Sequence, residues 1–262
     1  MTYETILFSI ERGIARLTLN RPDKLNSFNT TMHAEVRRAL ESLAGSEARV
    51  LILTGAGRGF CAGQDLADRA VAPGSKGVDL GESIENYYKP LVLALQSLPL
   101  PVIAAVNGVA AGAGANIALA CDLVVAARSA SFVQAFCKLG LLPDSGGTWT
   151  LPRLIGPARA LGLTLLGNKL PAEQAAAWGM IWQCVDDHEL ESTVQTLADQ
   201  LAIAPTRGLA WTKKAIGQSW DHSLAEQLDL ERDAQRELGR SADYAEGVAA
   251  FTGKRAPLFK GS

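Results

Sequence analysis

Two loops rich in small residues could supply main-chain N–H groups to a catalytic site. They are GAGRGFCAGQDL at 55–66 and NGVAAGAGANIALACD at 107–122, and each follows an apolar run typical of a buried strand. The first turn of a helix carries N–H groups without partners, and small residues let a ligand approach them closely. The two loops could therefore each aim one N–H at a single oxygen, as an oxyanion hole does. The alternative is a pair of tight packing turns, because Gly-rich turns are weak signals.

Asp144 is the carboxylate that the sequence favours as an acid–base group. It lies in a Pro-Asp-Ser-Gly-Gly loop between apolar stretches at 139–142 and 149–151. A carboxylate among apolar side chains suits a base that removes a proton next to a carbonyl and then returns it. The alternative role is capping of the following helix. Asp65 and Asp122 also lie in the loop motifs, and we interpret them as a loop-holding group and a structural acceptor.

Alternating strand and helix patterns predict the frame that positions these loops. Residues 68–83 lack periodicity and predict a mobile loop where a substrate lid would lie. Repeated strand–helix units indicate an α/β fold, with helices outside a sheet and a helical tail. The predicted strands are 6–10, 14–19, 50–54, 102–106, 123–127, 131–132 and 181–185. The predicted helices are 30–43, capped by Asn29 or Thr30, 84–98, 117–119, 151–166, one beginning near 172, 190–203, 206–218, 223–239 and 242–252.

The composition excludes several classes of protein. The chain has 262 residues, 48% of them hydrophobic, and a formal net charge of −2, so nothing suggests nucleic acid or a membrane surface as a partner. No apolar run reaches the roughly 18–20 residues that span a bilayer, and the N-terminus lacks the layout of a signal peptide. The four cysteines and three histidines have no metal-ligand spacing. These features predict a cytoplasmic protein with reduced thiols and no bound metal.

The paired motifs GFCAGQDL (59–66) and NGVAAGAGANIALACD (107–122) resemble those of the crotonase, or enoyl-CoA hydratase/isomerase, superfamily. Further matches are LNRPDKLNSFN (19–29), KLGLLPDSGGTWTLPRLIG (138–156) and EGVAAFTGKRAPLF (246–259). The resemblance covers essentially the whole chain in the expected order. It implies a ββα spiral core over residues 1–200 and a helical trimerisation region over 201–262. It also implies homotrimers, or hexamers built as dimers of trimers.

The resemblance also implies roles for individual residues. It places the oxyanion-hole donors at Ala62 and Ala113, followed by Gly114. The second donor is usually glycine in the family, so Ala113 is a departure. Hydratases of the family split water with two glutamates, and this chain has Asn116 and Phe136 at those positions. The loss of both carboxylates disfavours hydration. Asp144 matches the aspartate of the family's dienoyl-CoA and ring-epoxide isomerases.

A lone carboxylate beside an oxyanion hole fits isomerisation of a CoA thioester through an enolate. Segments 62–69, 134–149 and 162–187 resemble the isomerases of phenylacetate degradation. That branch converts 2-(1,2-epoxy-1,2-dihydrophenyl)acetyl-CoA to oxepin-CoA. One alternative is a Δ3,Δ2-enoyl-CoA isomerase that uses the same aspartate. Another, of a different class, is a non-catalytic CoA-ester-binding or assembly protein, against which the presence of Asp144 argues.

The remaining site predictions concern the substrate pocket. Apolar walls are expected from Phe136, Leu142 and Trp149, with Tyr87 or Tyr88 near the lid. Gln64 could line the same pocket, and contact with substrate is also expected at Asp65, Gly114 and Asn116. By analogy with the family, Lys24 with Arg21 would hold the CoA phosphates, and Phe251, Lys254 and Arg255 would reach them from a neighbouring subunit. The resemblance implies no cofactor other than the coenzyme A of the substrate.

Overall fold

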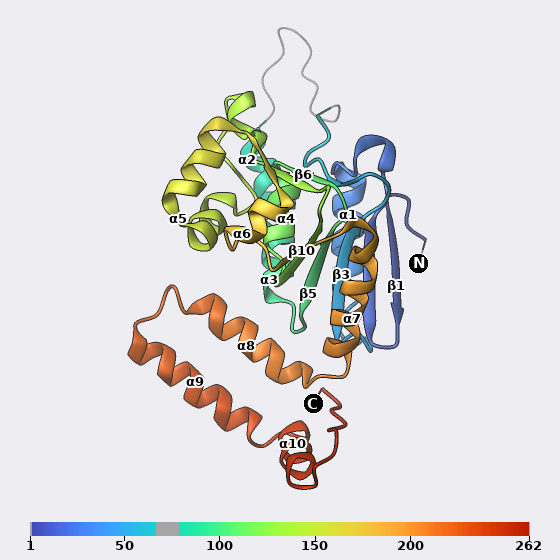
Figure 1. Cartoon of the computed structure of the whole chain (residues 1–262), viewed down its shortest axis with the longest axis vertical. Coiled ribbons are helices and arrows are strands. Elements are labelled where there is room, and N and C mark those ends of the chain that lie inside the picture. The colour runs from blue at the N-terminus through green and yellow to red at the C-terminus, as the bar shows by residue number, and fades with distance from the viewer. Residues whose placement is uncertain (1, 67–78, 262) are drawn as a thin grey trace.

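A computed structural model describes residues 2–66 and 79–261 and has the α/β architecture that the sequence predicts (Figure 1). Its strands form a larger sheet in the order β1-β2-β3-β5-β7-β10 and a smaller sheet in the order β4-β6-β8-β9. The strands are β1 (Ile6–Glu11), β2 (Ile14–Leu19), β3 (Val50–Gly55), β4 (Gly59–Cys61), β5 (Val102–Val106), β6 (Val109–Ala111), β7 (Leu123–Ala127), β8 (Ser131–Val133), β9 (Lys169–Pro171) and β10 (Gln183–Val185).

The larger sheet is parallel except at its first strand. β1 and β2 form an antiparallel hairpin through Arg12 and Gly13, which both have positive φ. From β2 the neighbouring strands run parallel through β3, β5, β7 and β10. The residues of β5 are all buried and those of β3 nearly all, as expected for parallel strands covered on both faces. These long apolar strands agree with the sequence prediction.

The smaller sheet was not predicted as such. The sequence pattern predicts loops at 55–66 and after 106, whereas the structure forms the three-residue strands β4 and β6 there and pairs them in parallel. β8 pairs with β6 in parallel and with β9 in antiparallel fashion. Strands of three residues are too short to show a period in sequence. The smaller sheet therefore joins the two motif loops side by side.

Helices cover the sheets and cap the loops between them. Asn29 caps α1, where its side chain accepts the N–H of Met32, as predicted. Residues 80–83 of the predicted loop form a helix, and residues 68–78 of it lie outside the described residues. The helical elements are η1 (Pro22–Lys24), α1 (Thr30–Glu41), α2 (Leu80–Ser83), the π-helical η3 (Ile84–Tyr88), α3 (Lys89–Ser97), α4 (Ala113–Leu119), η4 (Ala135–Leu139), α5 (Gly147–Leu166), α6 (Ala172–Ala177), η5 (Asp187–Glu189) and α7 (Leu190–Ala202).

Three further helices follow α7 and lie apart from the sheets (Figure 1). They are α8 (Thr206–Gln218), α9 (Leu224–Leu238) and α10 (Ala242–Thr252), close to the predicted bounds. The ammonium of Lys213 on α8 lies 2.8 Å from Asp122 and donates to the Leu95 carbonyl. Arg49 donates to the Ala204 and Phe259 carbonyls and ties the tail to the core. The predicted division at residue 200 stays a prediction; α7 packs on β3, β5 and β7 of the core.

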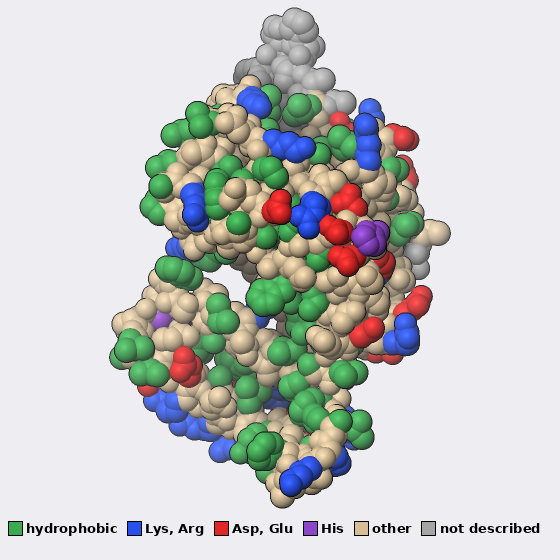
Figure 2. All heavy atoms as spheres, in the orientation of Figure 1, with side chains coloured by type: hydrophobic (Ala, Val, Ile, Leu, Met, Phe, Trp, Pro, Cys, Tyr) green, Lys and Arg blue, Asp and Glu red, His purple; other side chains and the backbone are tan. Residues whose placement is uncertain are grey.

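The C-terminal helices expose many apolar side chains, which Figure 2 shows as hydrophobic groups over the lower part of the molecule. Phe251 is 88% exposed and Leu224 is 76% exposed. Large apolar side chains exposed together mark a surface that another molecule covers. The exposed apolar set, which we call the tail face, comprises Ile216, Trp220, Leu224, Leu228, Tyr244, Val248, Phe251 and Leu258.

Candidate active site

The two motif loops meet where β4 and β6 end and α4 begins. Gly63 has a φ of +88°, and a methyl group there would lie 2.9 Å from the Ala111 carbonyl oxygen and 3.2 Å from the Ala113 nitrogen. A methyl group on Gly114 would lie 2.2 Å from the Cys61 carbonyl oxygen. Both positions therefore require glycine, because the two backbones touch there. The contact places the peptide after Gly63 beside the N-terminus of α4.

Ala62 is not an oxyanion-hole donor in this structure, which corrects the sequence prediction. Its N–H donates to the Leu25 carbonyl at 2.9 Å and is used within the fold. Phe28 forms a parallel β-bridge with Gln64. In this bridge the Phe28 N–H donates to the Gly63 carbonyl, and the Asp65 N–H donates to the Phe28 carbonyl. Because successive peptide groups alternate in direction, the Gln64 N–H points to the side opposite Phe28.

The N–H groups that fit an oxyanion hole are those of Gln64 and Ala113. Gln64 follows Gly63, whose backbone packs on Ala113. Ala113 is the first residue of α4, so its N–H precedes the first internal hydrogen bond of the helix. Two N–H groups from different loops converging near a helix N-terminus suit a developing negative charge. The sequence pattern places the second donor at Ala113 and misses the first by two residues.

Asp144 lies on a loop that is bonded to α4. Its main-chain carbonyl accepts the Asn116 side-chain N–H at 2.8 Å and the Gly147 N–H at 2.9 Å. Its carboxylate accepts the Ser145 hydroxyl at 2.8 Å and is half-buried. Helix α5 begins after Gly146, which has no side chain to cap it, and the alternative role of Asp144 as a helix cap stays open. The main chain of Asp144 is therefore held beside the helix whose N-terminus is the proposed hole.

Asn116 lies on α4, and Phe136 lies on η4 next to Gly112, the residue before α4. Asn116 is 1% exposed, and its side-chain oxygen accepts the Gln134 amide at 2.9 Å while its nitrogen donates to Asp144. The structure therefore gives Asn116 a loop-holding contact instead of the predicted contact with substrate. The Phe136 ring lies 3.7 Å from the position of a methyl group on Gly112. Phe136 thus lies beside the residue that precedes α4, and its role as a wall of the substrate pocket stays a prediction.

Asp65 and Arg21 hold the first loop. The Arg21 guanidinium lies 2.8 Å from the Asp65 carboxylate and also donates to the Ser27 carbonyl. Both side chains are largely buried, so Arg21 serves the fold and not a CoA phosphate, contrary to the prediction. Asp65 likewise acts as the predicted loop-holding group, and its contact with substrate stays a prediction. The Tyr88 hydroxyl, fully buried, donates to the Gln64 side-chain oxygen at 2.8 Å.

The other predicted pocket residues lie at the periphery. Leu142 is on the Asp144 loop and 73% exposed. The Trp149 ring packs on the Arg153 guanidinium at 4.0 Å, so one of its faces is already covered. Lys24 is exposed next to Leu25, whose carbonyl accepts the Ala62 N–H. Lys254 follows α10, which lies at the lower end of the molecule in Figure 1, whereas α4 lies in its upper part.

Other chemistry is not assembled in the described part of the chain. Burial raises the pKa of the Cys61 thiol to about 12 and that of Cys121 further, so neither is a nucleophile at neutral pH. Burial also raises the pKa of Asp122, whereas nearby Lys213 lowers it, in agreement with its predicted structural role. No group of three or more His, Cys, Asp or Glu side chains that could hold a metal is found in residues 2–66 and 79–261. Within those ranges, no helix has both the length and the apolar character that a membrane crossing needs.

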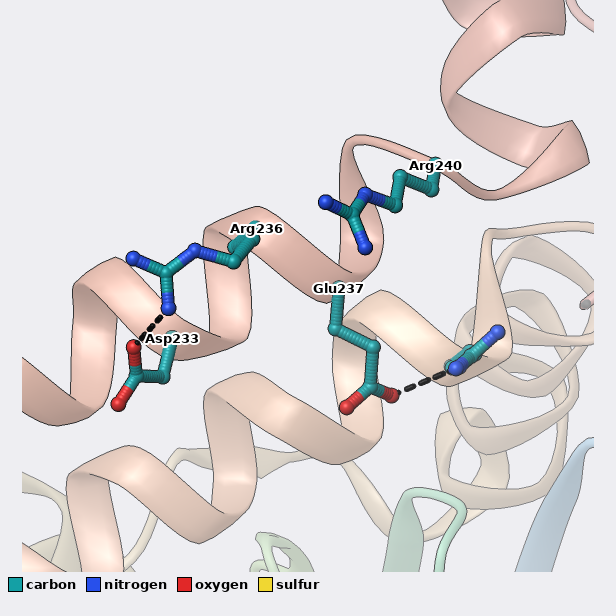
Figure 3. A pocket seen from close by; sticks show the side chains of 5 residues that line it. Asp233, Arg236, Glu237 and Arg240 are labelled. Atoms are coloured by element: carbon teal, nitrogen blue, oxygen red, sulfur yellow. Dashed lines mark hydrogen bonds and ion pairs between the residues drawn. The ribbon is translucent and has the colours of Figure 1, made fainter.

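Two hollows in the described surface belong to the C-terminal helices. Figure 3 shows one between α8 and α9, where Arg207 lies 2.6 Å from Glu237 and Arg236 lies 2.6 Å from Asp233. These ion pairs are solvent-exposed, and such pairs contribute little to the free energy of folding. The second hollow is apolar and lined by Leu238, Tyr244, Val248, Phe251 and Phe259 among others. Neither includes Gln64, Ala113 or Asp144, so neither is the candidate active site.

Comparison with known proteins agrees with this geometry. The family model described as enoyl-CoA hydratase/isomerase matches residues 9–262. The chain is 60% identical over 259 residues to the 1,2-epoxyphenylacetyl-CoA isomerase of Escherichia coli, covering 98% of this chain and 99% of that protein. It is 49% identical over 261 residues to a Rhodobacter capsulatus protein named a probable enoyl-CoA hydratase, with both chains fully covered. The crystal structure of enoyl-CoA hydratase from Bacillus anthracis superposes with a TM-score of 0.93 at 33% identity, covering 99% of this chain and all of the other. The chain therefore belongs to the enoyl-CoA hydratase/isomerase family.

Proposed function

We propose that this protein isomerises a CoA thioester through an enolate, converting 2-(1,2-epoxy-1,2-dihydrophenyl)acetyl-CoA to oxepin-CoA in phenylacetate catabolism. The observation that carries the proposal is that Asn116 bonds the Asp144 loop to the helix that begins with Ala113. The loop that carries the proposed base is thus bonded directly to the helix that carries one proposed oxyanion donor. The 60% identity to 1,2-epoxyphenylacetyl-CoA isomerase supports the choice of substrate.

The proposed reaction needs one base and one anion site. Asp144 removes a proton from the carbon next to the thioester carbonyl, and the electron pair moves onto the carbonyl oxygen. The Gln64 and Ala113 N–H groups stabilise that oxygen, each contributing about 3 kcal/mol to lowering the barrier. The ring epoxide rearranges while the enolate exists, and Asp144 returns the proton. Substrate and product have the same composition, so no cofactor or metal enters the balance.

Hydration is disfavoured by the same residues. Activation of water needs a proton-accepting group aimed at it. Asn116 has no carboxylate, and its amide already bonds Gln134 and Asp144. Phe136 offers no hydrogen bond to water. A Δ3,Δ2-enoyl-CoA isomerase would use the same Asp144 and the same N–H groups, so it is the second candidate.

The test is a panel of CoA thioesters run on the wild type and on Asp144→Asn. Removal of a general base is expected to lower kcat for the ring epoxide by about 10²–10⁴-fold with the fold retained. Product formation is followed by chromatography, and a Δ3-enoyl-CoA and crotonyl-CoA are assayed in parallel. Asp221→Asn, an exposed change near the α8–α9 turn, is the control and should match the wild type. Unchanged turnover by folded Asp144→Asn, or rapid hydration of crotonyl-CoA, would refute the proposal.

We also propose that the active form is a cytoplasmic homotrimer, or a hexamer of two trimers. The exposed tail face supports this, since apolar area of that kind needs a cover. In that assembly, Lys24 of one chain and Lys254 of its neighbour would hold the CoA phosphates. Lys254 comes directly after α10, which lies away from α4 in Figure 1, so a neighbouring chain is the proposed source of this cation.

A further inference from the structure

Gln134 lies in the fold between β8 and η4 and contacts the active-site helix. It is 3% exposed, and its side-chain amide donates to the Asn116 oxygen at 2.9 Å. Asn116 in turn donates to the Asp144 main-chain carbonyl at 2.8 Å. The two amides thus form a chain of hydrogen bonds that ends on the residue proposed as the base.

The direction of this chain is fixed at its Asp144 end. A main-chain carbonyl can only accept, so Asn116 must turn its nitrogen toward Asp144 and its oxygen toward Gln134. Gln134 must then offer its own N–H. If Asn116 turned over, two oxygens would face each other and a buried acceptor would lose its partner, which is costly. Gln134 therefore supplies the N–H that satisfies the Asn116 oxygen when the Asn116 amide is in the useful orientation.

Packing leaves the Asn116 side chain little freedom to compensate. A methyl group on Gly147 would lie 2.4 Å from the Asn116 nitrogen, so the start of α5 rests directly on the amide. Gly147 also donates to the Asp144 carbonyl at 2.9 Å. The loop between them turns through Ser145 and Gly146, which both have positive φ. A loop with this backbone depends on bonds to neighbouring elements for its position.

We propose that Asn116 and Gln134 are a positioning pair for Asp144: Gln134 orients the Asn116 amide, and that amide fixes the loop that carries the carboxylate. The inference rests on the proposed function for its catalytic consequence. Neither side chain needs to touch substrate. The pair also accounts for an amide at position 116, because an ionised carboxylate there could not donate to the Asp144 carbonyl.

The first test measures steady-state kinetics of Gln134→Met and Asn116→Ala, singly and together. Each single change should lower kcat by about ten- to a hundredfold, because misplacement of a catalytic group by about 1 Å has effects of that size. The KM should stay within about twofold. Because Gln134 acts through Asn116, the double variant should lose no more activity than Asn116→Ala alone. Multiplied losses in the double variant would overturn the proposal.

The matched control is Ser131→Ala, which removes another fully buried polar group on β8, three residues before Gln134. It should keep the kcat of the wild type. If Gln134→Met fails to fold, Gln134→Leu takes its place, since its side chain cannot donate to Asn116. A folded Gln134→Leu with the kcat of the wild type would overturn the proposal.

The second test needs no substrate, so its outcome separates this inference from the proposed function. Hydrogen exchange by mass spectrometry is followed in peptides covering 140–150, which include the Gly147 N–H that shares the Asp144 carbonyl. Gln134→Met should exchange faster there than the wild type, and Ser131→Ala should not. Unchanged exchange would overturn the positioning role. If the wild type failed to turn over the ring epoxide while exchange behaved as expected, only the proposed substrate would be wrong.

Discussion

At the scale of single residues, the candidate site depends on two glycines whose lack of a side chain lets two backbone segments touch. Gly63 and Gly114 allow one strand-end loop to rest on the backbone of the other, with no room for a methyl group at either position. That contact brings the backbone next to Gln64 against the Ala113 nitrogen. Glycine costs about 0.5–1 kcal/mol in chain entropy relative to alanine. A function that needs two convergent N–H groups accounts for that cost, as a packing turn alone does not.

The role of the Ala113 N–H can be tested without changing a side-chain function. Ala113→Pro removes the N–H at the first position of α4, where proline is tolerated because that N–H makes no helical bond. Loss of one oxyanion donor should lower kcat of the folded variant by about 10²–10³-fold. Ala113→Val adds similar bulk, keeps the N–H and is the control. Equal kcat losses in the two variants would show that bulk is responsible and that the N–H is not a donor.

Residue identities in the site were only partly readable from sequence. Asp144 and Ala113 stand in recognisable motifs. The choice between Ala62 and Gln64 depends on which peptide groups pair with Leu25 and Phe28, and that pairing joins segments more than thirty residues apart. Gln134 carries no local signal, because its role depends on Asn116, which is 18 residues away.

At the scale of elements, the fold places its active loops at the ends of parallel strands. β4 and β6 are short, and their pairing aligns the two loops before α4 begins. Long strands and long amphipathic helices were predicted well because burial repeats over several turns or pleats. The strands of three residues, and the helical turn at 80–83, were missed because so few residues show no period. These short elements are the ones that shape the site.

A second element-scale feature is the attachment of the N-terminal strand to α1 by Glu35. Its carboxylate is 4% exposed and accepts the Thr5 hydroxyl and the main-chain N–H groups of Glu4 and Thr5. Burial raises the pKa of Glu35, but these hydrogen bonds and the nearby Arg38 lower it more, so it lies below 4.5. The ionised form is therefore favoured by folding.

This gives a pH-dependent prediction. The stabilisation by Glu35 is complete above pH 4.5 and is lost as the pH falls through the lowered pKa of the folded state, because the unfolded chain then binds more protons. Glu35→Gln should cost about 2 kcal/mol of unfolding free energy at pH 7, and the difference should shrink below pH 4.5. Urea unfolding at several pH values measures it. Glu41→Gln, exposed at the end of the same helix, is the control, and a gap that widens in acid would contradict the assignment.

At the scale of the molecule, the chain divides its work between a core and a set of C-terminal helices. The core carries Gln64, Ala113 and Asp144, while α8 to α10 lie apart from it and contact it through Lys213 and Arg49. Charged side chains on α9, including Arg232 and Arg236, pair with acidic neighbours. The tail face lacks such partners and consists of large apolar groups. The order of helices was predictable from sequence, but their placement away from the core was not, because a helical period does not say what its apolar face meets.

The exposed apolar helices lead to a prediction about assembly and catalysis together. The wild type should have a solution mass of three or six times 27.7 kDa by light scattering. Changing Phe251 and Leu258, which are 88% and 78% exposed, to aspartate should yield smaller species, because charges buried in an apolar interface are unfavourable. The KM of this double variant should rise more than its kcat falls, since a neighbouring chain's Lys254 would no longer reach the CoA phosphates. Gln235→Asp, exposed on the charged helix α9, should keep both the mass and the KM. A monomeric wild type with full activity would contradict the proposed assembly. An unchanged KM in the dissociated variant would show that Lys254 is not part of the substrate site. The proposal for Asp144 and the two N–H groups, which all belong to one chain, would be unaffected by that result.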